Sequence, residues 1–365
     1  MCKMDALGRW DAIKHARTVV SPAVLRQLGA WENKARQVRS DIVAVRRSIK
    51  RRPTAAGNSI NSIASASLKI TLSTMSTIAL LGFRGQLAKP IVDAVTSPEF
   101  AGKYQLPVRV LTRTIPDDAE AYANVKFYKV DATDVESLKP ALEGVHALLN
   151  LTAFDVSADA LLEAAVATGV QVYFPSDFGI SGDHYNKSFI AGKNAAAAKA
   201  RAAGIPKVVR IYNGVFLEFV TDYGLFGPNP ETGELKVYGD GNHPLATTAL
   251  ADVGKSVASL AYRSPSELPD SVRLASEVTS VNKIVAEYEK ASGKKAKVEY
   301  DPDTKAILAK AEANEIPPTD FFTILYALAT VDTTTNFVEN ERELVNPGLW
   351  TWKTVAGAFA EKYKA

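Results

Sequence analysis

The sequence predicts an α/β protein with a doubly wound parallel sheet and a smaller C-terminal α+β lobe. Three observations lead to this prediction. From Thr77 onward, short runs of β-branched and aromatic residues alternate with segments of helical length, as in a sheet with right-handed helical crossovers. A glycine-rich turn, GFRG, follows the first of these runs. After Asn213 the alternation stops, and turn residues become frequent.

The predicted sheet domain occupies residues 75–213. We expect its strands at residues 77–81, 108–113, 125–130, 146–152, 170–176 and 207–213. We expect its helices at residues 86–96, 135–142, 157–168 and 189–203. In the third helix, Leu161, Leu162, Ala165 and Val166 share one face, and Gly169 follows as a C-cap.

The predicted C-terminal lobe occupies residues 214–365. Turn residues at 232–233 and 239–241 flank short strands, and residues 297–300 form a β-like run. Amphipathic helical segments are expected at residues 251–262, 281–291, 304–313 and 352–363. Because open α/β sheets bind ligands at the carboxyl ends of their strands, we expect this lobe to form the wall of a substrate site there.

Basic residues are concentrated at the N-terminal end. Residues 1–74 contain 14 Lys and Arg against 4 Asp and Glu, whereas the whole chain contains 43 against 40. This extension fits a mitochondrial transit peptide, a disordered arm for nucleic acid or a membrane surface, or sequence upstream of a start at Met75. We expect a cytoplasmic protein, or a mitochondrial one if the extension is a transit peptide.

The composition excludes several classes of protein. No apolar run approaches the roughly 18 residues of a membrane helix, so we expect a soluble chain without a span. The single cysteine, Cys2, excludes an internal disulfide, and with 4 histidines no metal site is expected. Because the residues after Met75 are net acidic, direct binding to nucleic acid is not expected.

The turn after the first strand has the features of a pyrophosphate site. Gly82 permits a tight turn, Gly85 leaves room for a phosphate, and the next helix offers free N–H groups to the anion. Pro90 falls in the first helical turn, where its missing N–H breaks no bond. At the start of a βαβ series, this turn predicts a Rossmann-type NAD(P)-binding domain. The expected cofactor-binding residues here are Gly82, Phe83, Arg84, Gly85, Gln86 and Leu87.

The end of the second strand favours NADP(H) over NAD(H). An acidic residue there would bind the ribose hydroxyls of NAD, whereas an arginine would face the extra phosphate of NADP. The sequence has Arg113 at this position and no acidic residue before Asp117. Arg84 offers a second positive charge to that phosphate. Asp131, which follows the third strand, is expected beside the adenine.

A series of motifs resembles one known family. In chain order they are GFRGQLA, VRVLTR, KVDATDVESL, VYFPSDFG, GKNAAAAKARAAGIP, NGVF and YGDGN. They resemble the NmrA-like and isoflavone reductase-like branch of the atypical short-chain dehydrogenases/reductases, from about Met75 to the C-terminus. Two positions depart from the family pattern: Arg84 stands where Thr or Ser is usual, and Ala88 stands where a third glycine is usual.

The resemblance implies a catalytic lysine on the helix after PSDFG. The family's lysine stands eleven residues before the glycine of GIP, as Lys193 does before Gly204. Its ammonium would orient the nicotinamide ribose and donate a proton to a developing alkoxide or enolate. Lys187 and Lys199 are out of this register and are expected on the surface.

Other site residues are expected at the strand ends. The cofactor side comprises Thr152, Ala153, Ser176 and Phe178, and the substrate side comprises His184, Asn213 and Phe216. The neighbouring aromatic residues Phe219, Tyr223 and Phe226 would suit an apolar planar ligand. Tyr122 and Lys126 match the Tyr-x-x-x-Lys spacing of other short-chain dehydrogenases. We interpret that match as coincidental, because it precedes the third strand, far from the nicotinamide.

The resemblance implies an oxidoreductase, an NADPH-dependent reductase of a small carbonyl, enone or phenylpropanoid-like substrate. The alternative is a redox sensor of the NmrA type, which binds NAD(P) without turnover and acts through a protein partner. The fold alone does not separate the two, although Lys193 favours the enzyme. The substrate, the stereochemistry of its reduction and the oligomeric state stay open at this level.

Overall fold

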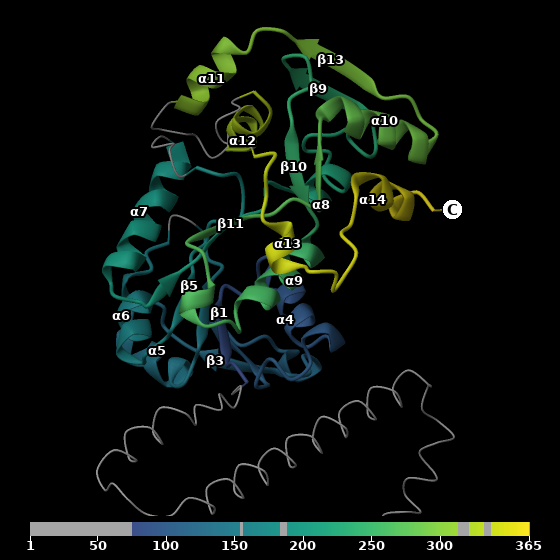
Figure 1. Cartoon of the computed structure of the whole chain (residues 1–365). Helices are drawn as coiled ribbons and strands as arrows, with labels where there is room; N and C mark the ends of the chain where they lie inside the picture. The colour runs from purple at the N-terminus through teal and green to yellow at the C-terminus, as the bar shows by residue number, and fades with distance from the viewer. Residues whose placement is uncertain (1–74, 154–155, 183–187, 313–320, 332–336, 365) are drawn as a thin grey trace, which may run out of the picture. The chain divides into compact units, whose positions relative to one another are not determined.

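The computed structural model describes residues 75–153, 156–182, 188–312, 321–331 and 337–364 (Figure 1). Its central element is a six-stranded parallel sheet in the order β3-β2-β1-β4-β5-β6. The strands are β1 (Ile78–Leu81), β2 (Val108–Thr112), β3 (Val125–Lys129), β4 (Ala147–Asn150), β5 (Val172–Phe174) and β6 (Lys207–Val208). The strand order reverses between β1 and β4, and the prediction of a doubly wound sheet is confirmed.

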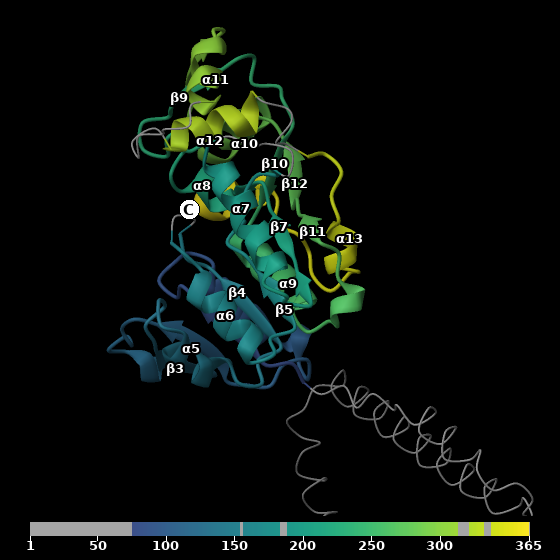
Figure 2. The ribbon, with the colours of Figure 1, turned by 90° about the vertical axis from the view of Figure 1, so that its left-hand side faces the viewer.

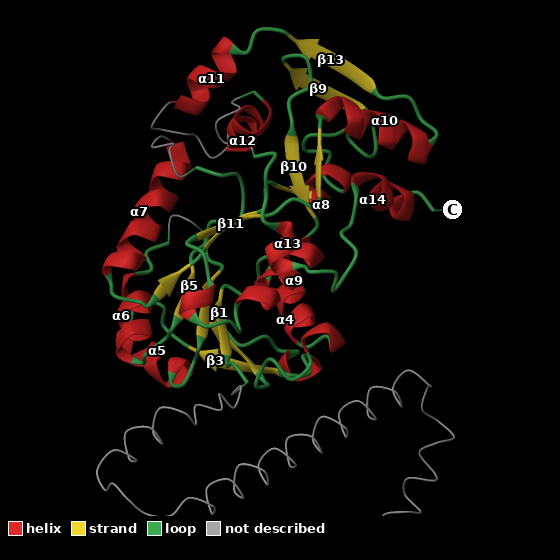
Figure 3. Cartoon of the chain, in the orientation of Figure 1, coloured by secondary structure: helices red, strands yellow, loops and turns green. Residues whose placement is uncertain are grey.

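Helices cover both faces of this sheet, as Figure 3 shows. Along β1, Ile78 and Leu80 belong to the core under one layer of helices, whereas Ala79 and Leu81 belong to the core under the other. This alternation follows from the two-residue period of a strand. The first layer contains α4 (Ala88–Val95) and α9 (Leu250–Leu260), and the second contains α5 (Val135–Leu142), α6 (Asp159–Ala167) and part of α7 (Ser188–Ala202).

Several boundaries differ from the sequence prediction by a few residues, and two of the differences bear on the site. The first helix begins at Ala88, two residues later than expected, and Pro90 lies in its first turn. The single strand expected at 207–213 was wrong, because β6 is followed by a separate β7 (Arg210–Tyr212). The Arg210 N–H donates to the Asp270 carbonyl oxygen at 3.0 Å, and β7 pairs with β11 (Ser271–Arg273) instead of extending the main sheet.

The C-terminal lobe has its own hydrophobic core and two small sheets (Figure 1). One sheet has the order β12-β10-β8 and the other pairs β13 with β9. The strands are β8 (Val215–Phe216), β9 (Glu234–Tyr238), β10 (Leu245–Thr248), β12 (Glu277–Thr279) and β13 (Lys297–Asp301). The helices are α8 (Leu217–Thr221), α10 (Val281–Ser292), α11 (Lys305–Glu312), α12 (Phe321–Thr330), α13 (Arg342–Val345) and α14 (Val355–Lys362).

The chain passes between the lobe and the sheet domain more than once. Helix α9 follows the lobe strand β10, yet it packs on α4 so closely that a Cβ on Gly254 would lie 2.3 Å from the Pro90 carbonyl oxygen. Helix α7 runs alongside both parts (Figure 2), with Phe189 and Ile190 in the core of the lobe and Ala200 in the core beneath the sheet. The middle of α7 therefore lies between the two cores.

No helix within the described residues is long and apolar enough to cross a lipid bilayer.

Candidate functional site

The glycine turn after β1 is built around close contact with β4. Gly82 has a φ of +105°, and a Cβ at this position would lie 2.7 Å from the carbonyl carbon of Leu151. The two strand ends are tied together, because the Leu151 N–H donates to the Leu81 carbonyl oxygen at 2.8 Å. A Cβ on Gly85 would meet nothing closer than the Gly82 carbonyl oxygen, at 3.6 Å. The backbone at Gly85 thus has open space beside it, three residues before α4 begins.

The side chains of this turn point to different neighbours. The ring of Phe83 packs against Tyr122 and Phe127, with centroid distances of 5.1 and 4.9 Å, and Leu87 packs against the main core. Gln86 is exposed, and its Nε2 donates to the hydroxyl of Tyr223 at 3.4 Å, which connects the turn to the residues after α8. The Tyr122 ring therefore belongs to an aromatic group at the β3 side of the sheet.

The charged residues predicted for the adenosine end lie after β1, β2 and β3. Arg84 and Arg113 are both exposed, so that their guanidinium groups face solvent. The Oδ1 atom of Asp131 accepts hydrogen bonds from the Thr133 hydroxyl at 2.7 Å and the Thr133 N–H at 2.8 Å. These bonds lower the pKa of the Asp131 carboxyl and orient the exposed carboxylate.

A buried asparagine at the end of β4 connects the predicted cofactor residues. The Asn150 Oδ1 accepts from the Thr152 hydroxyl at 2.7 Å and from its N–H at 3.1 Å, and the Asn150 amide donates to the Tyr173 hydroxyl at 3.2 Å. The Ser176 hydroxyl donates to the Thr152 carbonyl oxygen at 2.6 Å, and Ala153 is exposed beside them. The sequence analysis missed Asn150, although a polar residue ending the apolar strand ALLN is a signal for it.

Lys193, predicted as catalytic, lies near the middle of α7 with a half-buried side chain. Its Nζ donates to the carbonyl oxygen of Asp177 at 2.6 Å and lies 5.8 Å from the centroid of the Phe189 ring. Loss of hydration lowers the pKa of Lys193 to about 8. The charge of Asp177 opposes this shift, and the charge of Arg210 adds to it.

The carboxylate of Asp177 is bound by Arg210 of β7. The Arg210 Nε donates to Asp177 Oδ2 at 2.8 Å, and its Nη2 donates to Oδ1 at 2.9 Å. The two residues are only 2% and 3% exposed. The same Nη2 donates to the side-chain oxygen of Asn194, the residue after Lys193, at 2.8 Å. The sequence analysis missed Asp177, Arg210 and Asn194 as site residues, although an arginine inside the apolar run KVVRIY is unusual enough to point to a buried partner.

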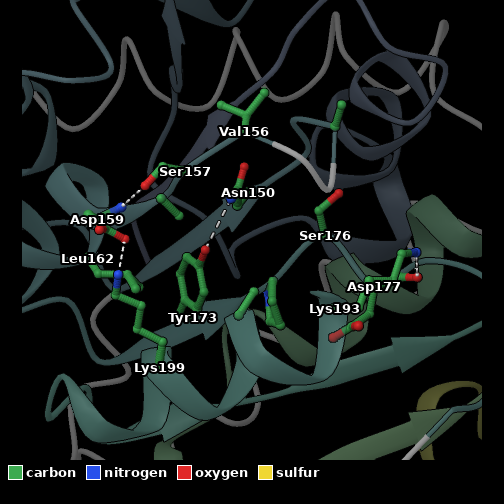
Figure 4. Close-up of a pocket in the computed structure, with 14 residues that line it drawn as sticks. Asn150, Val156, Ser157, Asp159, Leu162, Tyr173, Ser176, Asp177, Lys193 and Lys199 are labelled. Carbon is green, nitrogen blue, oxygen red and sulfur yellow. Dashed lines mark hydrogen bonds and ion pairs between the residues drawn. The ribbon is translucent and has the colours of Figure 1, made fainter. Parts of the chain in front are cut away.

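Lys193 and Asp177 line two cavities. The first, called here the α6 cavity, has a volume of about 220 Å³. Figure 4 shows its polar residues, with Lys193 at one end and the Asp159–Lys199 ion pair at the other. It is lined by side chains that include Asn150, Ser157, Asp159, Tyr173, Ser176 and Lys199. Burial raises the pKa of the Tyr173 phenol to about 12, so this group is neutral at physiological pH.

The second cavity, called here the aromatic cavity, has a volume of about 260 Å³. Its aromatic lining residues are Phe178, Phe189, Tyr212, Phe216, Phe219 and Phe322. The ring of Phe219 contacts those of Phe216 and Phe322 edge to face, with centroid distances of 5.3 and 6.3 Å. The Lys193 side chain forms part of an otherwise apolar wall, together with the Asp177–Arg210 ion pair.

The remaining predicted residues lie in several places. Asn213 is fully buried, and it is not among the residues that line either cavity. Phe226 belongs to the core of the lobe, where it stacks on Tyr326 at 5.2 Å. Lys199 is exposed, and its Nζ lies 2.5 Å from the Asp159 carboxylate. His184 and Lys187 lie outside the described residues.

Comparisons with known proteins show the family and the fold of this chain. The model of the NmrA-like family matches residues 74–357. Eugenol synthase 2 of Clarkia breweri is 28% identical over 290 residues, which cover 73% of this chain and 90% of that protein. The crystal structure of isoflavone reductase superposes with a TM-score of 0.65 at 21% identity, covering 79% of this chain and 100% of that one. The binary complex of leucoanthocyanidin reductase with NADPH from Vitis vinifera has a TM-score of 0.61 at 18% identity, covering 79% and 99%.

Proposed function

The chain belongs to the NmrA-like family, and we propose that it is an NADPH-dependent reductase of a small carbonyl, enone or phenylpropanoid-like compound. One observation carries this proposal. A lysine ammonium with a lowered pKa forms part of the wall of an aromatic cavity, beside the strand ends where a dinucleotide fold binds its ligand. A proton donor at the edge of an apolar, ring-lined space is what the reduction of an aromatic ketone or enone requires.

The residues present fit a dinucleotide. The open backbone at Gly85 and the first turn of α4 would hold the pyrophosphate, since the position of a Cβ at Gly85 is free. The exposed guanidinium groups of Arg113 and Arg84 would hold the extra phosphate of NADP. Asp131 would lie beside the adenosine. Residues Thr152, Ala153, Ser176 and Phe178 would hold the nicotinamide half.

When bound, the reduced cofactor supplies a hydride to an electrophilic carbon of the substrate. The part assigned to Lys193 is the matching proton, which its ammonium donates to the substrate oxygen as negative charge develops there. A lysine with a pKa of about 8 is mostly protonated at neutral pH, yet it releases its proton more readily than an ordinary lysine. The substrate thus gains one hydride and one proton, and Lys193 regains its proton from solvent.

The aromatic cavity sets the class of substrate. A volume of about 260 Å³ suits one small ring system better than an extended ligand. The edges and faces of Phe216, Phe219 and Phe322 would pack around a planar ring. The related proteins support this choice, because isoflavone reductase and leucoanthocyanidin reductase are named for compounds that contain aromatic rings, and one structure of the latter contains NADPH.

The test is a fluorescence titration of the full chain with NADPH, NADP+, NADH and NAD+ in parallel, followed by NADPH oxidation assays with aromatic ketones and enones. We expect tightest binding of NADPH and oxidation of NADPH with at least one aromatic compound. If the oxidised cofactors bind tightly, the reduced ones bind weakly and no compound is reduced, the chain is a dinucleotide sensor and the reductase proposal fails.

A further inference from the structure

The Lys193 ammonium lies beside Asp177 but does not form an ion pair with the carboxylate of that residue. Its Nζ donates to the backbone carbonyl oxygen of Asp177 at 2.6 Å. Both side-chain oxygens of the same aspartate accept hydrogen bonds from Arg210 instead. An arginine fork matches the geometry of a carboxylate in this two-point arrangement, so it binds the group more specifically than a lysine does. Lys193 is left with a neutral acceptor.

This arrangement is not the simplest way to stabilise the fold. A buried ion pair loses hydration on both sides, and well-packed apolar residues often stabilise a core equally well. Here Arg210 also binds Asn194 at 2.8 Å, and the Asn194 amide donates to the Gly182 carbonyl oxygen at 2.8 Å. One guanidinium thus joins β7 to the loop after β5 and to α7, on either side of Lys193. Such a connection fixes the position of the Asp177 peptide relative to the helix that carries Lys193.

We propose that Arg210 is a positioning residue for Lys193. By binding both carboxylate oxygens of Asp177, Arg210 leaves only the carbonyl oxygen of that residue as an acceptor for the Lys193 ammonium. The ammonium is thereby kept at the wall shared by the two cavities. The role in turnover rests on the proposed function, in which Lys193 is the proton donor. A lysine held in a tight ion pair with the carboxylate would be a poorer donor, because the ion pair favours its charged form.

Within the described residues, the charged and titratable groups around Lys193 come from five parts of the chain: the loop after β5, β7, β5, α6 and α7. Asp177 lies in the loop after β5 and Arg210 on β7. On the side of the α6 cavity are the Tyr173 phenol and the mutually paired Asp159 and Lys199. On the side of the aromatic cavity is Tyr212, whose ring lies 5.1 Å from the Arg210 guanidinium. Among these groups, only Asp177 and Arg210 shift the pKa of Lys193.

The test compares the variant Asp177→Asn with the double variant Asp177→Asn/Arg210→Met. The single variant removes the negative charge of Asp177 and leaves the positive charge of Arg210, so the titration of Lys193 should move to lower pH by about one unit or more. The second removes both charges but keeps the backbone carbonyl, so the titration should return toward that of the unmodified chain. The second variant removes both members of the Asp177–Arg210 ion pair together, and thermal unfolding establishes that both variants fold.

The titration is measured in two ways on the full chain. In the first, isotope-labelled lysine is followed by NMR at its Cε, and Lys193 is identified by the signal that the variant Lys193→Met lacks. In the second, the pH profile of NADPH oxidation is recorded. The pair Arg273 and Glu341, joined by a 2.6 Å contact, provides the control: neither residue lines the α6 cavity or the aromatic cavity, and Glu341→Gln should move neither titration.

Each outcome is decisive. If the Lys193 signal moves down in the single variant and back in the double variant, the inference stands. If it moves so while the chain reduces no compound, the positioning role of Arg210 holds and the reductase proposal fails. If both folded variants titrate as the unmodified chain does, or if the double variant stays at the lower pH of the single variant, Arg210 does not act on Lys193 and the inference is overturned.

Discussion

The Nζ atom of Lys193 lies 2.6 Å from the carbonyl oxygen of Asp177, and these two residues line both the aromatic cavity and the α6 cavity. The hydrogen bond gives the ammonium one fixed acceptor and leaves its other N–H bonds directed elsewhere. An acid that is held on one side and free on the other keeps its position while it donates a proton. This relationship is the basis of the first two predictions.

The pH dependence of turnover should follow the protonation of the Lys193 side chain. Its pKa is lowered to about 8, chiefly by loss of hydration, and it is the protonated form that donates. Turnover should therefore be retained below pH 8 and should fall by about tenfold per pH unit above it. The check is the rate of NADPH oxidation from about pH 6 to about pH 10 at saturating substrate. A rate that stays level up to pH 10 would mean that Lys193 is not the acid.

The variant Lys193→Met should lose turnover and retain its affinity for NADPH. Removal of a general acid typically lowers kcat by about a hundredfold to ten-thousandfold, whereas NADPH makes most of its proposed contacts elsewhere. Turnover and NADPH affinity are measured side by side. Lys199→Met is the control, since this lysine lies on the same helix and pairs with Asp159 at the surface. Equal losses in the two variants would remove Lys193 from the chemistry.

The variant Arg113→Ala should lower the affinity for NADPH much more than the affinity for NADH. A hydrogen bond to a charged group contributes about 1.5 to 3 kcal/mol, which corresponds to a roughly tenfold to hundredfold change in Kd. Only NADPH carries the extra phosphate, so the affinity for NADH should be nearly unchanged. Both Kd values are obtained from fluorescence titrations. Equal weakening of the two cofactors would place Arg113 outside the phosphate site.

The variant Gly82→Ala should destabilise the fold and lower the affinity for the cofactor. Its Cβ would lie 2.7 Å from the Leu151 carbonyl carbon, and the φ of +105° is unfavourable for alanine. Gly144→Ala is a matched control, because Gly144 also has a positive φ, +69°, but open space around its Cβ. The control should cost about 1 kcal/mol of unfolding free energy, and Gly82→Ala should cost more. Chemical denaturation of both variants measures the difference, and equal costs would contradict the predicted clash.

The variant Phe219→Ala should raise KM for an aromatic substrate and leave NADPH affinity unchanged. Phe219 contacts both Phe216 and Phe322 in the wall of the aromatic cavity, so its loss removes apolar contact area from the site. The expected increase in KM is about tenfold. Phe226→Ala serves as a comparison, since that ring is fully buried in the core of the lobe and should affect stability instead. An unchanged KM for Phe219→Ala would show that the substrate binds elsewhere.

The sequence by itself determined the sheet domain and the glycine turn after β1. Apolar runs of strand length, alternating with helices, predicted the first five strands of the sheet and the start of the sixth, because a strand buried on both faces needs a continuous apolar run. The glycine turn was predictable from local chemistry alone, since a positive φ and a close backbone approach both require Gly82. The family match over residues 74–357 agrees with the order of the motifs.

Only the tertiary structure decided which groups surround Lys193. Asp177 and Arg210 are separated by 33 residues, and a pairing over that distance depends on how β7 leaves the main sheet, which no local pattern specifies. The split of the sixth strand and the position of Lys193 at the wall of two cavities likewise depend on the packing of distant segments. Local sequence sets backbone conformation and burial, whereas the partner of a buried charge is selected by the packing of distant segments, because the charge must be compensated by whatever that packing brings within reach.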